Sequence, residues 1–294
     1  MSALGGAGAK PPDKKMERAP VKFYREVLAS LTKAKVPFLV GGAFAFCRYA
    51  GIDRRTKDLD LMIEERTWPD FARVVRAAGI HTRLTFPHWL GKALSPAGQV
   101  DVIFNGGAGL TPVDAEYFTH GVRAPVLGFD TMLCPAEELI WSKAFIMERE
   151  RFDGADVLHL IRALGDRLDW RRLRRRFAGH EPVLRAHLIL FKYAYPSEAS
   201  QIPDWLEDEL IGAIPRAEPS NQPVCRGTYL SRAQYLVDVD TWGYADGRLA
   251  PFGTMTERNW LIWTNAIDAK RAAIRGGKRR AAPRAALQVA LQET

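Results

Sequence analysis

A glycine pair, a short apolar stretch and an alternating run of aspartates and leucines follow one another near the start of this chain of 294 residues. This order constrains the fold more than any other feature. Leu39 and Val40 are expected to end a buried strand, and Gly41 and Gly42 let the backbone turn sharply. The helix expected from about Ala43 to Tyr49 would begin with free N–H groups at its positive dipole end. Such a turn can hold an anion, such as a phosphate group.

The aspartates that follow this helix alternate with leucines. In a strand expected over Asp58 to Ile63, Asp58 and Asp60 share one face, while Leu59 and Leu61 point into the core. Two carboxylates on one face can hold divalent metal ions at the ~3.5–4 Å separation of two-metal phosphoryl chemistry. The structural alternative is a pair of surface aspartates at the end of a strand.

A third carboxylate stands alone in an apolar segment. Asp101 lies within Gln-Val-Asp-Val-Ile-Phe, where a strand is expected over Gln99 to Asn105. An unpaired buried carboxylate is unfavourable, so Asp101 should meet a cation or a hydrogen-bond donor. On an adjacent strand it would lie beside Asp58 and Asp60 and supply the third oxygen ligand of two metal sites. It would then help to activate an attacking hydroxyl. A surface position at a strand end is the alternative here too.

The order of these motifs resembles a known family. Gly-Gly, then about a dozen residues, then Arg-x-Thr-x-Asp-x-Asp, then a later strand aspartate is similar to the nucleotidyltransferase superfamily. A second block runs from Glu137 to Lys143, continues with Arg149 and ends in Asp153-Gly154-Ala155-Asp156. It resembles the AbiEii-like branch, which is known from type IV toxin–antitoxin systems. The resemblance covers roughly residues 36–165.

This resemblance implies transfer of a nucleoside monophosphate from an NTP to a hydroxyl, with Mg²⁺ or Mn²⁺ as cofactor. It implies that Asp58, Asp60 and Asp101 hold the metal, with Asp101 as the base or base-orienting group, and that Lys143 offsets charge on the triphosphate. Many members carry Ser or Thr directly after the two glycines, and this chain has Ala43 there. A hydroxyl contact to phosphate is therefore missing, which puts NTP affinity or catalysis in question.

Lys143 also stands out without the resemblance. On a helix it shares a stripe with apolar residues three and four positions away, so it faces the core side, where lysine is rarely left unpaired. A triphosphate is one suitable partner. The structural alternatives are Asp153, Asp156 and Glu150. The two aspartates are expected to brace the lysine and the following arginine, not to bind metal.

Several basic residues are candidates for contact with phosphates. The predicted nucleotide-binding set is Gly41, Gly42, Arg55, Lys57 and Arg149. Arg54 belongs to the same basic run as Arg55 and Lys57. Solvated loop charges are the alternative for that run. Arg149 could instead pair with Asp153 four residues later.

The element pattern predicts an α+β fold, in which a nucleotidyltransferase-type mixed β-sheet core with helices precedes a mostly helical C-terminal domain. One long helix or a helix pair, broken near Asp153-Gly154, is expected over Glu137 to Leu164. The domain boundaries expected from composition and pattern are a disordered tail over 1–19, the sheet core over 20–133, the helical domain over 134–214, an irregular arm and helix over 215–269, and a basic flexible tail over 270–294.

Charge and composition narrow the partners. The net charge of +8 suggests an anionic partner, for which RNA or tRNA is plausible beside the NTP. The resemblance adds a cognate antitoxin as a further partner. No apolar run approaches the ~20 residues that cross a membrane, so no membrane partner is expected. Three scattered cysteines match no zinc or redox spacing and suggest a cytoplasmic setting.

Three other functions stay open. One is transfer to a small hydroxylated acceptor, as in aminoglycoside-modifying relatives of the superfamily. Another is nucleotide or RNA binding without catalysis, for which Ala43 is the best support. The third is a partner-binding component of a toxin–antitoxin pair. Phe86-Pro87-His88-Trp89 could line an acceptor pocket or belong to the core, and the arginine-rich turn Arg171–Arg176 could contact RNA or form a solvated face. The segment Val224–Tyr244 matches no mechanism.

Overall fold

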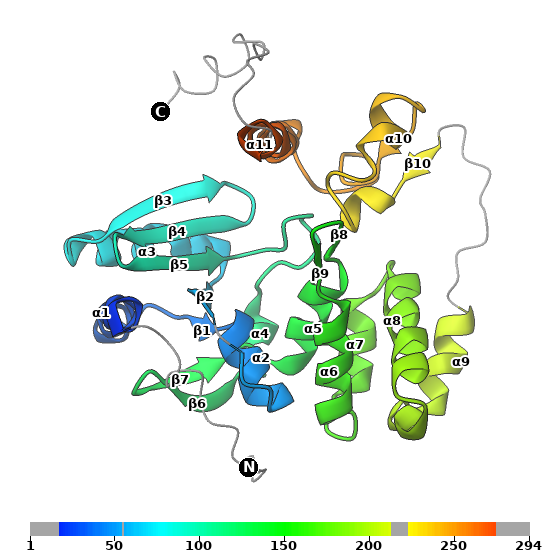
Figure 1. Ribbon diagram of the computed structural model, residues 1–294, viewed down its shortest axis with the longest axis horizontal. Helices are drawn as coiled ribbons and strands as arrows, with labels where there is room; N and C mark the ends of the chain where they lie inside the picture. Colours follow the sequence, from blue (N-terminus) through cyan, green and yellow to red (C-terminus); the bar gives the residue numbers. More distant parts are fainter. Residues whose placement is uncertain (1–17, 55, 213–222, 275–294) are drawn as a thin grey trace.

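A computed structural model describes residues 18–54, 56–212 and 223–274 of the chain. Residues 1–17 of the tail predicted over 1–19, residues 275–294 of the basic tail predicted over 270–294, and Arg55 lie outside the described residues. Residues 18–19 and 270–274 are described and belong to the helices Arg18–Lys33 and Glu257–Ile274. Figure 1 shows a central sheet, a group of helices beside it, and a C-terminal segment that runs back over both.

The sheet has seven strands in the order β3-β4-β5-β2-β1-β7-β6. It is mixed, because β1 pairs antiparallel with β2 and parallel with β7, while β2 pairs parallel with β5. The predicted α+β class with a mixed sheet is thus confirmed. The strands are β1 (Leu39–Val40), β2 (Asp58–Met62), β3 (His81–Phe86), β4 (Leu90–Ser95), β5 (Gly98–Ile103), β6 (Val122–Val126) and β7 (Phe129–Leu133).

Helices pack on the sheet and on one another. Helix α1 contacts α3 and β5, and α2 contacts β2, α5 and α6. Further along the chain, α5 to α8 form a helical group in which α5 contacts α6, α7 and α8 (Figure 1). The α-helices are α1 (Arg18–Lys33), α2 (Gly42–Ala50), α3 (Trp68–Ala77), α4 (Ala115–Thr119), α5 (Ala136–Ala144), α6 (Gly154–Leu164), α7 (Trp170–Arg176), α8 (Glu181–Ala194), α9 (Asp204–Gly212), α10 (Leu236–Asp240) and α11 (Glu257–Ile274).

A small hairpin interrupts the helical segment expected over residues 137–164. Helix α5 ends at Ala144, and β8 (Met147–Glu148) and β9 (Arg151–Phe152) pair antiparallel before α6 begins. The predicted pair of helices is present, but the break between them is wider than the Asp153-Gly154 step. The hairpin is held from outside, since the Met147 N–H donates to the Leu230 carbonyl at 3.0 Å. This tertiary contact could not be inferred from local pattern.

Two elements differ from the sequence-based expectation. The sequence predicts one or two short strands over Val113 to Leu127, where the structure has helix α4 followed by β6, and it predicts no strand over the residues of β7. Strands β6 and β7 are joined by a two-residue turn in which Leu127 and Gly128 both have positive φ. This is typical of a primed hairpin turn, which usually carries Asn or Gly at its first position. The leucine at that position conceals the turn in the sequence.

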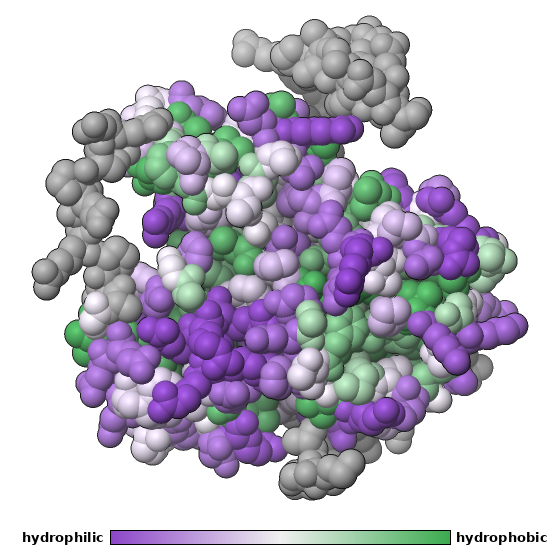
Figure 2. All heavy atoms as spheres, turned by 180° about the vertical axis from the view of Figure 1, so that it is seen from behind, coloured by the Kyte–Doolittle hydropathy of each residue, from purple (hydrophilic) through white to green (hydrophobic). Residues whose placement is uncertain are grey.

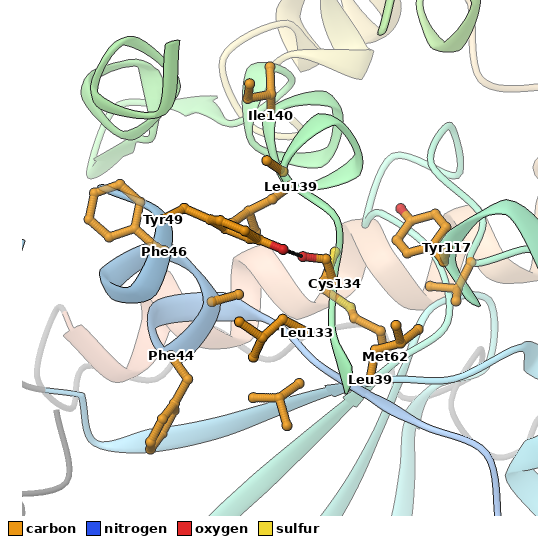
Figure 3. Packing of buried hydrophobic residues seen from close by; sticks show 14 of the residues in the cluster. Leu39, Phe44, Phe46, Tyr49, Met62, Tyr117, Leu133, Cys134, Leu139 and Ile140 are labelled. Carbon is orange, nitrogen blue, oxygen red and sulfur yellow. Dashed lines mark hydrogen bonds between the residues drawn. The ribbon is translucent and has the colours of Figure 1, made fainter. Parts of the chain in front are cut away.

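The core fills the space between the sheet and the helical group. Leu39, Leu133 and Ile140 are fully buried there, and the Tyr49 hydroxyl donates to the Cys134 carbonyl at 3.0 Å (Figure 3). This hydrogen bond satisfies the one polar atom of the Tyr49 side chain within apolar surroundings. It also fixes α2 to the segment that links β7 and α5.

The arginine-rich helix α7 is part of the interior. Arg172 pairs with Glu138 at 2.7 Å, and Arg176 pairs with Asp114 at 2.6 Å. Both arginine side chains are about nine-tenths buried or more. The expectation of a solvated or RNA-binding face is therefore wrong for these two arginines, which tie α7 to α5 and α4. A charged face of a helix and a buried ion-pair network have the same sequence pattern.

Polar side chains cover most of the face seen in Figure 2, with smaller apolar areas between them. Ile189 and Tyr193 of α8 are among the large apolar residues that are exposed in the described part of the chain. In the described part of the chain, no helix combines the length and apolar character that crossing a membrane requires.

Candidate active site

Three aspartates meet on two neighbouring strands. Strands β2 and β5 run parallel, and their register places Asp60 directly beside Asp101 and Asp58 beside Gln99. All three aspartates are half-buried, whereas the alternating Leu59 and Leu61 are fully buried. The strand alternation of Asp-Leu-Asp-Leu thus gathers the carboxylates on one face and uses the leucines for the core.

The glycine turn lies against this carboxylate group. The Gly41 N–H donates to the Asp60 carbonyl at 2.9 Å. Gly42 has φ of +52°, and a Cβ there would be 1.7 Å from Oδ2 of Asp60. No side chain longer than hydrogen therefore fits at Gly42. Helix α2 begins at this residue without a side-chain cap, so its first N–H groups point out beside Asp60. Ala43 is half-buried in the first turn.

Burial and mutual repulsion raise the pKa values of two of these carboxyl groups, Asp58 and Asp60. Desolvation, followed by the charges of Asp101 and Asp58, raises the pKa of Asp60 to about 6. Desolvation and the charge of Asp101 also raise the pKa of Asp58. The Tyr24 hydroxyl of α1 donates to the Lys57 carbonyl at 2.7 Å, and burial together with the three carboxylates raises the pKa of Tyr24 to about 12. For Asp58 and Asp60, burial and repulsion between carboxylates thus outweigh the stabilisation by the nearby basic side chains.

Lys92, on β4, belongs to the site and is not among the residues predicted from the sequence. It lies opposite Asp101 in the antiparallel β4–β5 register, and its Nζ is 2.6 Å from Oδ1 of Asp101. The Gln99 amide donates to the same oxygen at 3.1 Å. The signal available in the sequence is a lysine within the apolar segment Leu-Gly-Lys-Ala-Leu, which needs a carboxylate partner for the same reason that Asp101 needs a cation.

Lys143 is buried within an ion-pair network. Its Nζ is 2.8 Å from carboxylate oxygens of both Asp153 and Asp156. Arg151 binds Asp153 at 2.9 Å, and Arg54 binds Asp156 at 2.6 Å. These aspartates are two of the structural alternatives expected for Lys143, and they are the contacts it makes. The charge of Lys143 nevertheless acts on Asp60, whose pKa it lowers. Its contact with a nucleotide remains a prediction.

The arginine beside the site is Arg151, two residues beyond the predicted one. Arg149 lies in the turn of the β8–β9 hairpin, is exposed, and donates to Gln234 at 3.3 Å. The suggested pair with Asp153 does not form, because that pairing requires a continuous helix. The charge of Arg151 lowers the pKa values of both Asp58 and Asp60. Lys57 is exposed and also lowers the pKa of Asp58.

The donor set fits a divalent cation in chemistry, but no complete cage is preformed. In the described ranges, no three His, Cys, Asp or Glu side chains are grouped as a ready metal site. Asp101 is turned toward Lys92 and Gln99, which leaves Asp58 and Asp60 as the carboxylates without a bonded cation among the residues described. Mg²⁺ is typically held by one or two carboxylates together with substrate phosphates, so this pair suffices as the protein's share.

The aromatic residues after β3 belong to a cluster and not to an open pocket wall. Phe86, His88 and Trp89 surround Trp263 of α11 with ring centroids 4.7 to 5.8 Å away. The Arg232 guanidinium lies over the same indole, 3.9 Å from its centroid. Of the two roles expected for residues 86–89, an acceptor pocket or part of the core, the contacts fit the core. The cluster joins the C-terminal segment to the β3–β4 hairpin.

The segment Val224–Tyr244, for which the sequence suggests no mechanism, has a structural role. Strand β10 (Val224–Cys225) pairs parallel with β11 (Ala245–Asp246). Asp246 binds the fully buried Arg248 at 2.6 Å and accepts a hydrogen bond from Trp260 of α11 at 2.8 Å. A buried ion pair thus organises this part of the chain, which also supports the β8–β9 hairpin through the Leu230 carbonyl.

Comparison with known proteins gives low similarities only. A scan against protein-family models and a search of curated proteins return no match. Among solved structures, the antibiotic-resistance factor ANT(2'')-Ia is 17% identical over 58% of this chain and 98% of its own, with a TM-score of 0.43. An antigenic nucleotidyltransferase-like protein from Paracoccidioides brasiliensis is 15% identical over 63% of this chain and 93% of its own, with a TM-score of 0.39. JHP933 from Helicobacter pylori is 15% identical over 67% of this chain and 88% of its own, with a TM-score of 0.36. At these values the likenesses assign no activity, which has to come from the residues themselves.

Proposed function

We propose that this chain is a metal-dependent nucleotidyltransferase that moves a nucleoside monophosphate from an NTP to a hydroxyl acceptor. The observation that supports this most is the convergence of Asp58, Asp60 and Asp101 beside the Gly41-Gly42 turn. Cations stabilise neighbouring carboxylates such as Asp58 and Asp60, whose pKa values are raised, and a helix start without a side-chain cap is suited to bind an anion. A metal-bound triphosphate would supply both the cation and the anion.

The proposed roles follow from the contacts. Asp58 and Asp60 would hold a divalent ion such as Mg²⁺ or Mn²⁺, which supplies charge neutralisation on the triphosphate. The N–H groups at the start of α2 would face phosphate oxygens. Lys57, Arg151 and the network around Lys143 add positive charge beside the carboxylates.

Asp101 is suited to take the proton of the acceptor. Its Oδ1 accepts from Lys92 and Gln99, so the carboxylate is oriented, and Oδ2 accepts no hydrogen bond from the residues that the structure describes. In the proposed step the acceptor oxygen attacks the α-phosphorus, the bond from that phosphorus to pyrophosphate breaks, and the hydroxyl proton passes to Asp101.

For the branch and the acceptor, we propose an AbiEii-like enzyme that acts on RNA, with tRNA as one candidate. The net charge of +8 and the basic side chains beside the carboxylates favour a polyanionic acceptor. An aminoglycoside-type small acceptor and binding without catalysis are outcomes of the test below.

The test is label transfer. The full chain would be incubated with Mg²⁺, each α-labelled NTP in turn, and bulk bacterial RNA, beside Asp58→Ala and Asp60→Ala variants checked for folding by circular dichroism. Label on RNA with the wild type only would support the proposal and name the nucleotide. Label transferred only when a small hydroxylated acceptor replaces the RNA would overturn the RNA assignment. No label on either kind of acceptor with any NTP would favour binding without catalysis. Full activity of both variants would overturn the site assignment.

A further inference from the structure

We propose that Lys92 takes the place of a second metal ion at this site, so that the protein binds one divalent cation and not two. The inference rests on the proposed function, because it concerns the same carboxylates. It departs from the two-metal arrangement that the aspartates alone would suggest.

The sheet register lines up the relevant side chains. Lys92 on β4 lies opposite Asp101 on β5, and Asp101 lies beside Asp60 on β2. Neighbours across adjacent strands on one face are within side-chain reach of each other. The three residues therefore form a row in which the ammonium group, the third aspartate and the metal-facing aspartate follow one another.

The contact between Lys92 and Asp101 is short, shielded and fixed. The N–O distance is 2.6 Å, and the side chains are only 15% and 18% exposed. The Gln99 amide holds the same carboxylate oxygen in place. A partly buried pair is screened far less than a surface pair, so it persists where surface ion pairs are loosened by salt.

The balance of charges favours a single divalent ion. Asp58, Asp60 and Asp101 carry three negative charges when ionised, and among the described residues Lys92 is the cation bonded to this group. The remaining two charges match one divalent ion. Lys143 and Arg151 act on these carboxylates from a distance, but they do not change this count of bonded charges, because both are paired with Asp153 or Asp156. Lys57 is exposed and makes no ion pair with this group among the described residues. A second divalent ion on Asp101 would have to displace Lys92 or lie beside its positive charge, which is unfavourable.

The positions without a cation agree with this assignment. Asp58 and Asp60 make no ion pair with a basic side chain in the part of the chain that the structure describes, while Asp101 makes one. The divalent ion is therefore assigned to Asp58 and Asp60, and the third aspartate keeps its lysine.

The experiment counts bound Mn²⁺ on the full chain at neutral pH by electron paramagnetic resonance of the free ion. We expect one Mn²⁺ per wild-type chain, one for Lys92→Arg, and a second, new site for Lys92→Met. Asp101→Asn should still bind one ion, because the ion does not depend on Asp101. Thermal unfolding would show which variants are folded, and the wild-type and Asp101→Asn counts stand on their own if Lys92→Met does not fold.

The outcomes separate this inference from the proposed function. Two Mn²⁺ on the wild type, one on a folded Lys92→Met, or none on Asp101→Asn would each overturn the role of Lys92 while leaving a metal site in place. Unchanged binding by an Asp58→Asn/Asp60→Asn double variant would overturn the metal site itself, and with it both proposals.

Discussion

Gly42 lies so close to Asp60 that the two residues determine each other's conformation. A Cβ at Gly42 would be 1.7 Å from the Asp60 carboxylate oxygen and 2.8 Å from its Cβ. The backbone of Gly42 also has φ of +52°, where a side chain adds strain. The glycine turn is therefore a requirement for placing the carboxylate, besides being suited to approach a phosphate.

Gly42→Ala is expected to displace Asp60 and to abolish Mn²⁺ binding and transfer. The strain of the positive φ costs about 1–2 kcal/mol, and moving Asp60 adds to it. Gly51→Ala is the matched control, because Gly51 has φ of +69° and a Cβ there would meet nothing within 4 Å. It should lose a similar strain energy in urea unfolding and keep metal binding. Equal metal binding by both variants would contradict this account.

The Asp60 carboxyl should make stability depend on pH in a defined direction. Its pKa is about 6 in the folded chain, above the ordinary value of 3.8, so the folded state binds more protons between these values. The ionised Asp60 carboxylate therefore lowers the free energy of unfolding above pH 6, and this destabilisation disappears as the pH falls toward 4. In protein kept metal-free with a chelator, Asp60→Asn should raise the unfolding free energy by roughly 2–3 kcal/mol at pH 7 and change it little at pH 4.

Asp156 should behave in the opposite sense and serves as the comparison. Burial alone would raise its pKa, but contacts with Arg54 and Lys143 hold that pKa below the ordinary value. Its contribution is present at neutral pH and is lost as the pH falls through the folded pKa. Asp156→Asn should therefore destabilise the protein at pH 7 and still at pH 4, which lies above the folded pKa of Asp156. Urea titrations of both variants from pH 4 to 8 would show opposite signs at pH 7 and the disappearance of the Asp60→Asn effect alone at pH 4.

Most of the candidate site can be predicted from short sequence patterns. The alternation around Asp58 and Asp60 and the glycine pair specify a strand face and a turn, which depend only on neighbouring residues. The lone strand aspartate predicts a partner but not its identity. Lys92 could not be assigned to Asp101, because the pairing depends on which strands adjoin and in what register. That is a property of the sheet and not of either segment.

The departures from expectation have the same origin. The β8–β9 hairpin replaces helix because distant residues hold it, and this exchanges Arg149 for Arg151 beside the aspartates. The arginines of α7 resemble a surface in the sequence because their acidic partners, Glu138 and Asp114, lie tens of residues away. Local periodicity specifies faces, and tertiary pairing decides what those faces meet.

Lys143→Met should expose how the buried network contributes. Removal of the ammonium group leaves Asp153 and Asp156 each with one arginine partner. The unfolding free energy should therefore fall by less than it would if an isolated buried ion pair were broken. Breaking a buried pair costs about 3–5 kcal/mol, and we expect the lower end of this range in urea unfolding. Lys192→Met is the control, since its pair with Glu207 is about one-third exposed and should cost less than about 1 kcal/mol.

The nucleotide contact of Lys143 is tested separately with the same variant. An equimolar mixture of the four NTPs with Mg²⁺ should raise the melting temperature of the wild type, because a ligand that binds the folded state stabilises it. If Lys143 contacts the triphosphate, this rise should disappear in folded Lys143→Met and persist in Lys192→Met. An unchanged rise in Lys143→Met would leave the lysine with a structural role only.

Trp263 should anchor α11 to the sheet. Its indole is enclosed by Phe86, Trp89 and the Arg232 guanidinium, and it fills the space beside Gly107, where a Cβ would lie 2.7 Å from the ring. Trp263→Ala removes these contacts and, because Trp263 is only partly buried, should cost less than the about 3–5 kcal/mol lost at a fully buried tryptophan. Because the cluster joins distant segments, the loss should appear first as release of the C-terminal segment. Limited proteolysis with peptide mapping should then show faster cleavage between residues 223 and 260. Leu261→Ala, at a side chain 48% exposed, should stay within about 0.5 kcal/mol of the wild type and keep the wild-type cleavage rate. Equal protection of both variants would show that α11 is held by other contacts.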